Sequence, residues 1–398
     1  MELQSDVCII GNGAIGKVAA LGLAQSGLRV SLLCGTAVPA SGAVDAPWDV
    51  RVYAINHLAR SLLSSLRVWD ALHAERVALV DAMDIRGDGA DKAGHLVFDS
   101  YGARAGELAW IVEDANLNQA LDAALKFASN VQLVQGRAVR LHTDAASARV
   151  ILENGDVLKA ALVVGADGAH SWVRHQCEIG MDYRSYGQRA IVTNFTAEKP
   201  HRGVAYQWFT SEEGIVALLP LPGDRVSLVW SAPEALAQQL LAEPLEQLAQ
   251  RLGQYCDGVL GRLTPLQPEA VKSFPLALIR PHAITAPRVA LVGDAAHAVH
   301  PLAGHGMNLG FGDVADLLKV LDEREMQRDC GDPRVLGRYA RARKEDILLM
   351  QLATDGLERL FSSDFPPLRI MRNLGLNLVD RLPVIKRQLI SHALGRQS

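Results

Sequence analysis

The strongest constraint on the fold is a glycine-rich turn, GNGAIG, at residues 11–16. Residues 6–10 before the turn predict a buried strand, small residues up to about Ser26 predict a helix, and residues 28–33 predict a second strand. A strand, a glycine turn, a helix and a parallel strand form the βαβ unit that binds the pyrophosphate of a dinucleotide. We therefore predict an α/β fold that begins with a Rossmann-like domain. A glycine-rich turn without a ligand is the alternative interpretation.

Five of the six residues of this turn have a predicted role. Gly11 would make the tight turn, Gly13 would let a pyrophosphate approach backbone N–H groups, and Gly16 would let the helix pack closely on the strand. Ala14 and Ile15 lie at the N-terminus of the helix, where unpaired N–H groups attract anions. All five are candidate cofactor-binding residues.

A second candidate site lies late in the chain, in segment 287–313 (PRVALVGDAAHAVHPLAGHGMNLGFGD). Residues 289–292 predict a buried strand, and Asp294 follows its carboxyl end, where a carboxylate can accept hydrogen bonds from ligand hydroxyls. A glycine-rich loop then leads to a predicted helix at residues 308–321. Taken alone, the same pattern also describes a simple strand end and helix cap.

Together, the two segments resemble the FAD-contacting segments of the para-hydroxybenzoate hydroxylase superfamily of flavin monooxygenases. Residues 300–313 look most like the ubiquinone-biosynthesis hydroxylases, whose usual sequence has Gln at the position of His305. The resemblance implies that a helix N-terminus stabilises negative charge on the N1/C2 edge of the reduced flavin. His305 is expected to tune proton supply, because histidine titrates near neutrality. The candidate cofactor-binding residues here are Asp294, Gly304, Gly306, Met307 and Asn308, and the candidate catalytic residues are Pro301 and His305.

Three further positions extend the cofactor site. Arg51 takes the place of a family arginine and is expected to clamp the FAD phosphates, with a surface arginine as the alternative. Asp167 resembles the second fingerprint of the superfamily, linked to FAD and to the nicotinamide nucleotide, with a strand end and Asp-Gly turn as the alternative. Cys34 stands where this fold normally has an acidic residue that binds the adenosine ribose. We therefore expect either a substitute such as Thr36 or weaker binding of adenosine.

The middle of the chain predicts the substrate-binding part. Residues 131–164 predict a meander of short strands. Residues 189–230 predict consecutive strands of about six to eight residues each in an antiparallel sheet, which in this superfamily covers the substrate. We also expect one helix over residues 110–125 and an amphipathic helix over residues 234–253. The candidate substrate-pocket residues are Tyr206, Trp208, Phe209, Leu219 and Pro220, although aromatic residues on a sheet also form plain core.

Length and sequence pattern suggest three regions in the 398-residue chain. Residues 1–75, 100–180 and 276–330 are predicted to form the FAD-binding domain. Residues 76–99 and 181–275 are predicted to form the substrate domain. Residues 331–398 are predicted to form a helical region, which carries twelve Lys and Arg against seven Asp and Glu. Its basic amphipathic end is expected either to contact an anionic membrane surface or to pack against protein.

Composition limits the other partners. Apolar residues make up 49% of the chain and its formal net charge is −4, which permits a large core and argues against nucleic-acid binding. No apolar run reaches transmembrane length and no signal peptide is apparent, so we expect a cytoplasmic protein, with peripheral contact to the inner membrane as an open alternative. Five scattered cysteines argue against a disulfide framework. Three histidines, His297, His300 and His305, flank glycines in the cofactor loop, and we predict no metal site.

The family resemblance implies an enzyme. NADH or NADPH would reduce FAD, and the oxygen adduct at flavin C4a would transfer one oxygen atom from O2 to an electron-rich phenol ring. The absence of a second GxGxxG fits a nicotinamide nucleotide that binds only transiently. The leading prediction is a monooxygenase for a polyprenylated ring in ubiquinone biosynthesis. A hydroxylase for another aromatic compound and a non-catalytic flavin-binding subunit remain alternatives, as do contacts with other quinone-biosynthesis proteins and a homo-oligomer.

Overall fold

The computed structural model describes residues 1–35, 47–87, 94–100, 106–267, 269–300 and 305–362. Its centre is a six-stranded sheet in the order β20-β21-β13-β2-β3-β9, parallel except for the β20–β21 pair. The strands are β2 (Val7–Ile10), β3 (Val30–Cys34), β9 (Val131–Gln135), β13 (Leu162–Gly165), β20 (Thr285–Ala286) and β21 (Val289–Leu291). The predicted strand, turn, helix and strand at the N-terminus are confirmed as β2, α1 (Ala14–Gln25) and β3.

Apolar side chains cover both faces of this central sheet, which explains why its strands are uniformly apolar. On one face, α1, α3 (Asp114–Phe127) and α7 (His305–Asp322) form one core with residues of α2 (His57–Ser65) and α8 (Pro333–Ser362). A small four-stranded sheet packs on the other face, in the order β1-β12-β11-β10. Its strands are β1 (Glu2–Gln4), β10 (Ala138–Thr143), β11 (Ala148–Leu152) and β12 (Val157–Ala160). The predicted meander over residues 131–164 is therefore divided between two sheets.

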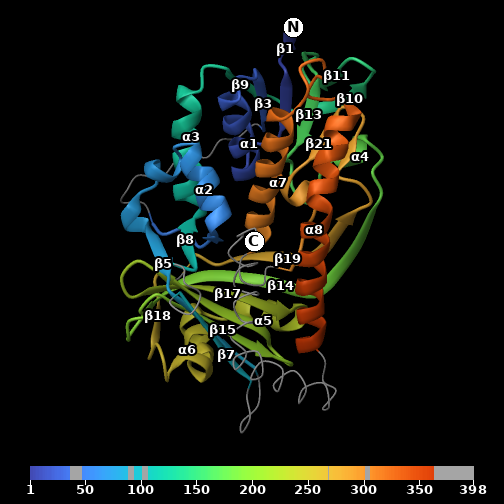
Figure 1. Ribbon diagram of the computed structural model, residues 1–398. Helices are drawn as coiled ribbons and strands as arrows, with labels where there is room; N and C mark the ends of the chain where they lie inside the picture. Colours follow the sequence, from blue (N-terminus) through green and yellow to red (C-terminus); the bar gives the residue numbers. More distant parts are fainter. Residues whose placement is uncertain (36–46, 88–93, 101–105, 268, 301–304, 363–398) are drawn as a thin grey trace.

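A second large sheet lies beside the first unit (Figure 1), in the order β18-β14-β17-β16-β15-β6-β7, and β19 also pairs with β14. Its strands are β6 (Ala82–Arg86), β7 (His95–Asp99), β14 (Met181–Ala197), β15 (Val204–Thr210), β16 (Gly214–Leu221), β17 (Arg225–Pro233), β18 (Leu263–Pro265) and β19 (Lys272–Pro281). Most pairings are antiparallel, as predicted, but β6 and β15 run parallel. Helices α5 (Glu234–Ala242) and α6 (Leu245–Cys256) share an apolar core with one face.

A three-stranded sheet, in the order β4-β8-β5, shares a further apolar core with the other face of the large sheet. Its strands are β4 (Val52–Ile55), β5 (Val77–Val80) and β8 (Ala109–Glu113). The remaining elements are α2 (His57–Ser65), η1 (Trp69–Ala71), η2 (Ala74–Arg76), α4 (Trp172–Gln176), η3 (Gly293–Ala295) and α8 (Pro333–Ser362). The predicted domain boundaries stay a prediction; β5 lies outside the large sheet, and β19 continues past residue 276.

Three predicted elements differ from the structure. The expected helix over residues 110–125 begins only at Asp114, because residues 109–113 pair with β4 and β5 as strand β8. The expected helix over residues 234–253 is divided at Pro244, since the residue before a proline avoids helical geometry and Glu243 is extended. Strand β14 has 17 residues, far longer than the six to eight expected. The basic C-terminal segment lies outside the described residues.

A buried carboxylate holds three of these elements together. Asp313, on α7, is fully buried and accepts a hydrogen bond of 2.8 Å from the N–H of Gly293 on η3. Its second partner is Nε2 of His297, at 2.6 Å, and its third is Nε of Arg343 on α8, at 2.8 Å. Nearby, the hydroxyl of Tyr339 on α8 donates to the carbonyl of Leu291 on β21. These bonds attach α7 and α8 to the end of a central strand.

The charge state of Asp313 follows from its partners. Desolvation raises its pKa, but His297 and Arg343 together lower it more, so the pKa falls below its ordinary value. An acid whose folded pKa is depressed stabilises the fold above its unfolded pKa, and this stabilisation is lost as pH falls through the folded pKa. The network is therefore intact near neutrality and weakens only in acid.

We predict that Asp313→Asn lowers the free energy of unfolding by about 3–5 kcal/mol at pH 7, because it leaves the Arg343 charge buried beside a neutral amide. The matched control is Asp346→Asn, which removes an exposed partner of the same arginine, 2.9 Å away, and should cost less than about 1 kcal/mol. Urea unfolding measures both values. Equal losses in the two variants would contradict the prediction.

Candidate cofactor and substrate site

The glycine turn after β2 has the geometry that the sequence predicted. Gly11 has a φ of +113°, and a Cβ there would lie 2.2 Å from the carbonyl oxygen of Ala166. A Cβ on Gly16 would lie 2.0 Å from the carbonyl oxygen of Gly11, so a side chain at either position collides with backbone. A Cβ on Gly13 would have no atom within 4 Å. The first turn of α1, which has no side-chain cap, therefore begins beside open space that suits a pyrophosphate.

The two distant glycine segments meet at Ile15. A Cβ built on Gly293 would lie 3.4 Å from Cγ2 of Ile15, and one built on Gly310 would lie 3.0 Å from its Cδ1. Ile15 thus lies between η3 and α7, one residue beyond the buried Ala14. This contact brings the turn at Gly13 next to the segment that carries Asp294.

Asp294 and Arg51 form the charged part of the site. The Asp294 side chain is exposed, yet surrounding protein partly desolvates it, which raises its pKa despite opposing effects of His297 and Arg51. Desolvation lowers the pKa of Arg51, but Tyr53 and nearby carboxylates, including Asp294, raise it more. The guanidinium of Arg51 lies 5.4 Å from the ring centre of Tyr53 and 5.6 Å from that of Phe274, on β19 of the large sheet. Arg51 and Asp294 therefore interact electrostatically, and contact of Arg51 with the FAD phosphates stays a prediction.

The N-terminus of α7 differs partly from the prediction. The helix begins at His305, three residues before the expected start, so Gly306 and Met307 belong to its first turn. Both amide atoms of Asn308 are used by the protein: Oδ1 accepts from the N–H of Asn56 at 3.0 Å, and Nδ2 donates to the carbonyl of Ala54 at 2.7 Å. Its side chain therefore attaches α7 to β4 and to the start of α2, and contact of Asn308 with the cofactor stays a prediction. Pro301, Gly304 and the side chain of His305 lie outside the described residues.

In the second fingerprint, the side chains of Asp167 and Arg174 make hydrogen bonds within the protein. The Asp167 carboxylate accepts from Oγ of Ser171 at 2.5 Å and from the N–H of Val173 at 3.0 Å, so it caps α4. Each oxygen accepts one hydrogen bond in this cap and keeps a further lone pair, so the expected contact of Asp167 with the cofactor stays a prediction. Arg174, which is buried, donates to the carbonyls of Ala169 and Ala295 and so holds η3 in place. This segment therefore helps to fix the position of η3, which carries Asp294.

Cys34 ends β3, where the adenosine ribose would bind. Its side chain is buried, and desolvation raises its pKa, so it is a neutral thiol at pH 7. A neutral thiol is a weak acceptor and cannot replace the bidentate carboxylate of this fold. The expected substitute, Thr36, lies outside the described residues.

The predicted substrate residues are divided between the two faces of the large sheet. Tyr206 and Trp208 stack at 5.8 Å and belong to the core shared with α5 and α6. Pro220 pairs with Val226 of that same core. Strand alternation therefore places these three side chains on the face toward α5 and α6, which favours the core interpretation, and their role in the substrate pocket stays a prediction. Leu219 has the opposite orientation and packs toward the three-stranded sheet.

Phe209 lies on the same side as Leu219, in a small cluster with Ile215 and Ile85.

Several residues of the site were not predicted from the sequence. Asp313 and Arg343 anchor η3, and His300 contacts the large sheet through Gln188, at 3.0 Å. The position of Asp313 at the end of the segment GDAAHAVHPLAGHGMNLGFGD is a signal that could have identified it. Arg343 and Gln188 carry no comparable signal, because their roles depend on contacts between distant segments.

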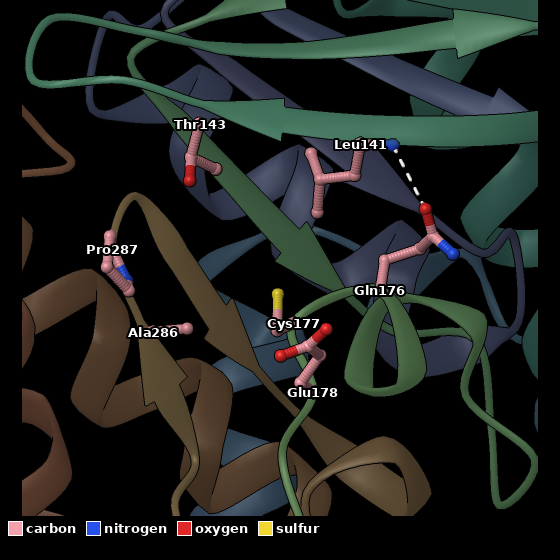
Figure 2. Close-up of a pocket in the computed structure, with 7 residues that line it drawn as sticks. All are labelled: Leu141, Thr143, Gln176, Cys177, Glu178, Ala286 and Pro287. Atoms are coloured by element: carbon pink, nitrogen blue, oxygen red, sulfur yellow. Dashed lines mark hydrogen bonds between the residues drawn. The ribbon is translucent and has the colours of Figure 1, made fainter.

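A surface cleft lies elsewhere in the molecule (Figure 2). It is lined by residues of β10, the end of α4 and the segment before β21, including Leu141, Cys177 and Pro287. Pro287 precedes the amino end of β21, whereas Asp294 follows its carboxyl end. The cleft is therefore not part of the site described above.

Comparison with known proteins agrees with this geometry. Residues 4–348 match the family model described as FAD binding domain. Over 395 residues the chain is 38% identical to 3-demethoxyubiquinol 3-hydroxylase of Escherichia coli, with 98% of each chain covered. It is 37% identical to ubiquinone hydroxylase UbiL of Rhodospirillum rubrum, with 98% of this chain and 90% of that one covered. The chain belongs to this family of FAD-dependent hydroxylases.

The solved structure of PqsL from Pseudomonas aeruginosa shares the fold of this flavin hydroxylase, with a TM-score of 0.76 and 23% identity, covering 94% of this chain and 99% of that one. The predicted cofactor, FAD, is confirmed by the family match. The residues present fit it: Gly13 leaves room for the pyrophosphate, and the exposed Asp294 offers an acceptor for a hydroxyl. Which residues contact FAD stays a prediction.

We predict that Gly13→Ala mainly weakens FAD binding, whereas Gly16→Ala mainly lowers the free energy of unfolding. Gly16→Ala should lower the free energy of unfolding of the FAD-free protein by about 1–3 kcal/mol, because its Cβ collides with Gly11. Gly13→Ala should cost less than about 1 kcal/mol but weaken FAD binding about tenfold or more, because the methyl group occupies phosphate space. Urea unfolding and FAD fluorescence titration measure the two effects. Normal FAD affinity in Gly13→Ala would contradict the prediction.

We also predict that Asp294 binds FAD at the expense of stability. An acid whose pKa is raised on folding destabilises the fold once it ionises, so Asp294→Asn should maintain or increase the free energy of unfolding at pH 7. The same variant should bind FAD about tenfold more weakly, since a charged acceptor is lost. In the parent protein, FAD affinity should fall as pH drops through the raised pKa, and this pH dependence should disappear in Asp294→Asn. An unchanged pH dependence of FAD binding in Asp294→Asn would contradict this prediction.

Proposed function

We propose that this protein is an FAD-dependent, NAD(P)H-using monooxygenase that hydroxylates the ring of a polyprenylated phenol or quinone precursor in ubiquinone biosynthesis. The observation that carries the proposal is the near full-length similarity to two ubiquinone hydroxylases. The contact of Ile15 with the Asp294 segment supports it, because it joins both halves of a flavin site. When bound, FAD would pass two electrons from the nicotinamide nucleotide to O2, so that one oxygen atom enters the ring and the other leaves as water.

The residues of the chain bind and orient the reactants. The backbone at Gly13 and the N-terminus of α1 hold the pyrophosphate, Arg51 neutralises its charge, and Asp294 accepts a hydrogen bond from the ribityl chain. The N–H groups of the first turn of α7 stabilise negative charge on the reduced ring system. These are electrostatic and positioning roles, and none requires a protein nucleophile.

The large sheet provides the wall opposite the cofactor elements. Its face toward the three-stranded sheet is apolar, and Leu219 and Leu221 lie in the core that the two sheets share, so we propose the margin of this core as the substrate wall. An apolar wall suits a ring with a hydrocarbon tail and excludes water from the reaction. None of the described helices combines the length and apolarity needed to cross a membrane. Access to a lipid-soluble substrate would then depend on peripheral contact through the basic C-terminal segment or on partner proteins.

A turnover assay tests the function. We predict that the FAD-loaded protein oxidises NADH or NADPH about tenfold faster when a polyprenylphenol in detergent is added, and that mass spectrometry detects a product heavier by one oxygen. With ¹⁸O2 the label should appear in the ring hydroxyl. NAD(P)H oxidation without stimulation and without product would contradict the proposal.

Deletion and complementation test the pathway. A strain that lacks the protein should accumulate a quinone precursor, and the Asp294→Asn variant should restore less product than the parent chain. Full restoration by a variant that no longer binds FAD would instead indicate a non-catalytic subunit. Activity on unprenylated phenols alone would indicate another aromatic substrate.

A further inference from the structure

His300 is a buried imidazole at the boundary between the cofactor segment and the large sheet. Its side chain has no exposed surface, and its Nε2 lies 3.0 Å from Oε1 of Gln188 on β14. Its ring meets the edge of the Tyr186 ring at 5.0 Å between centres. Burial lowers its pKa to about 4, so the imidazole is neutral at pH 7.

Gln188 determines which tautomer His300 adopts. The amide oxygen of Gln188 can only accept a hydrogen bond, so Nε2 of His300 must carry the proton. Nδ1 of the same neutral ring is then an acceptor with a free lone pair. This atom is buried and has no hydrogen-bond partner among the described residues. Leaving a buried acceptor without a donor is unfavourable, and a ligand that donates to Nδ1 would remove this cost.

The backbone around His300 joins the predicted cofactor segment to the large sheet. Two residues earlier, Ala298 exchanges two backbone hydrogen bonds with Ile279 on β19, at 3.0 and 3.1 Å. On β14, the pairing register with β19 shifts between Ser185 and Gln188. Gly187 lies in this irregularity with a φ of +65°, and Tyr186 and Gln188 on either side of it both contact His300. The cofactor segment is thus attached to the substrate sheet at this histidine.

We propose that Nδ1 of His300 is a specificity-determining acceptor that binds a hydroxyl group on the aromatic ring of the substrate. The inference rests on the proposed function, because it requires a hydroxylated ring to bind between the cofactor segment and the large sheet. A hydrogen bond from the hydroxyl to Nδ1 shifts electron density into the ring, which favours attack by an electrophilic oxygen. Gln188 acts as a positioning residue, because it holds the tautomer that leaves Nδ1 free.

Ligand pairs that differ only in the hydroxyl group test this role without turnover. The probes are 2-hexylphenol and hexylbenzene, and their binding to the FAD-loaded protein is measured by flavin absorbance or, where the spectrum does not change, by equilibrium dialysis. The parent protein should bind the phenol about tenfold more tightly, the ratio that one net hydrogen bond provides. In His300→Phe, which keeps an aromatic ring but has no acceptor, the ratio should fall below about twofold.

Two other variants complete the experiment. His282→Phe makes the same substitution at an exposed histidine and should keep the tenfold ratio. Gln188→Leu keeps the imidazole but removes the acceptor that holds the proton on Nε2, so the ratio should fall about threefold. This variant also tests the inference if His300→Phe does not bind FAD. The inference is overturned if the tenfold ratio persists in both His300→Phe and Gln188→Leu. If only Gln188→Leu can be measured, a tenfold ratio in that variant overturns it. A parent ratio near one overturns it as well.

This binding result is separate from the turnover assay. A tenfold ratio that depends on His300, without any oxygenated product, would support the acceptor and reject the proposed function. Product formation together with a binding ratio that does not depend on His300 would support the proposed function and reject the acceptor.

Discussion

The buried ionic contact between Asp313 and its three partners is the interaction on which the site depends. One carboxylate holds the N–H of Gly293, the ring of His297 and the guanidinium of Arg343. Desolvating these charges is expensive, and only the complete set of hydrogen bonds makes their burial tolerable. Because Gly293 directly precedes Asp294, the same contact sets the position of the Asp294 carboxylate, the predicted acceptor for a ligand hydroxyl. The helix that would stabilise flavin charge and the turn that would bind the ribityl chain are therefore positioned by one residue.

Close backbone packing provides the second constraint. Gly11 and Gly16 allow the first helix to approach the central sheet within distances that no side chain permits, and Ile15 then reaches the late segment. The protein keeps open space at Gly13 and an exposed carboxylate at Asp294, neither of which improves its own folding. Such costs are expected where a site is shaped for a ligand rather than for stability.

Local sequence predicted the elements that depend on local chemistry. The βαβ unit, the strand before Asp294 and the antiparallel sheet followed from apolar runs, small residues and glycines. The errors arose where pairing overrode local preference. Residues 110–113 joined a strand because β4 and β5 flank them, and β14 continued well beyond its predicted length because β19 pairs along it. The helix break at Pro244 was visible in the sequence, since proline restricts the residue before it.

The sequence by itself determined the cofactor class, the βαβ turn and the family, because these depend on residue types at fixed spacing along the chain. Only the tertiary structure decided which side chains face a ligand. It turned Tyr206 and Trp208 into a core with α5 and α6, and used the Asp167 and Asn308 side chains to hold helices. It also brought Gln188 to His300 across 112 residues. The physical reason is that strand register and helix docking, which local spacing does not encode, set the direction of each side chain.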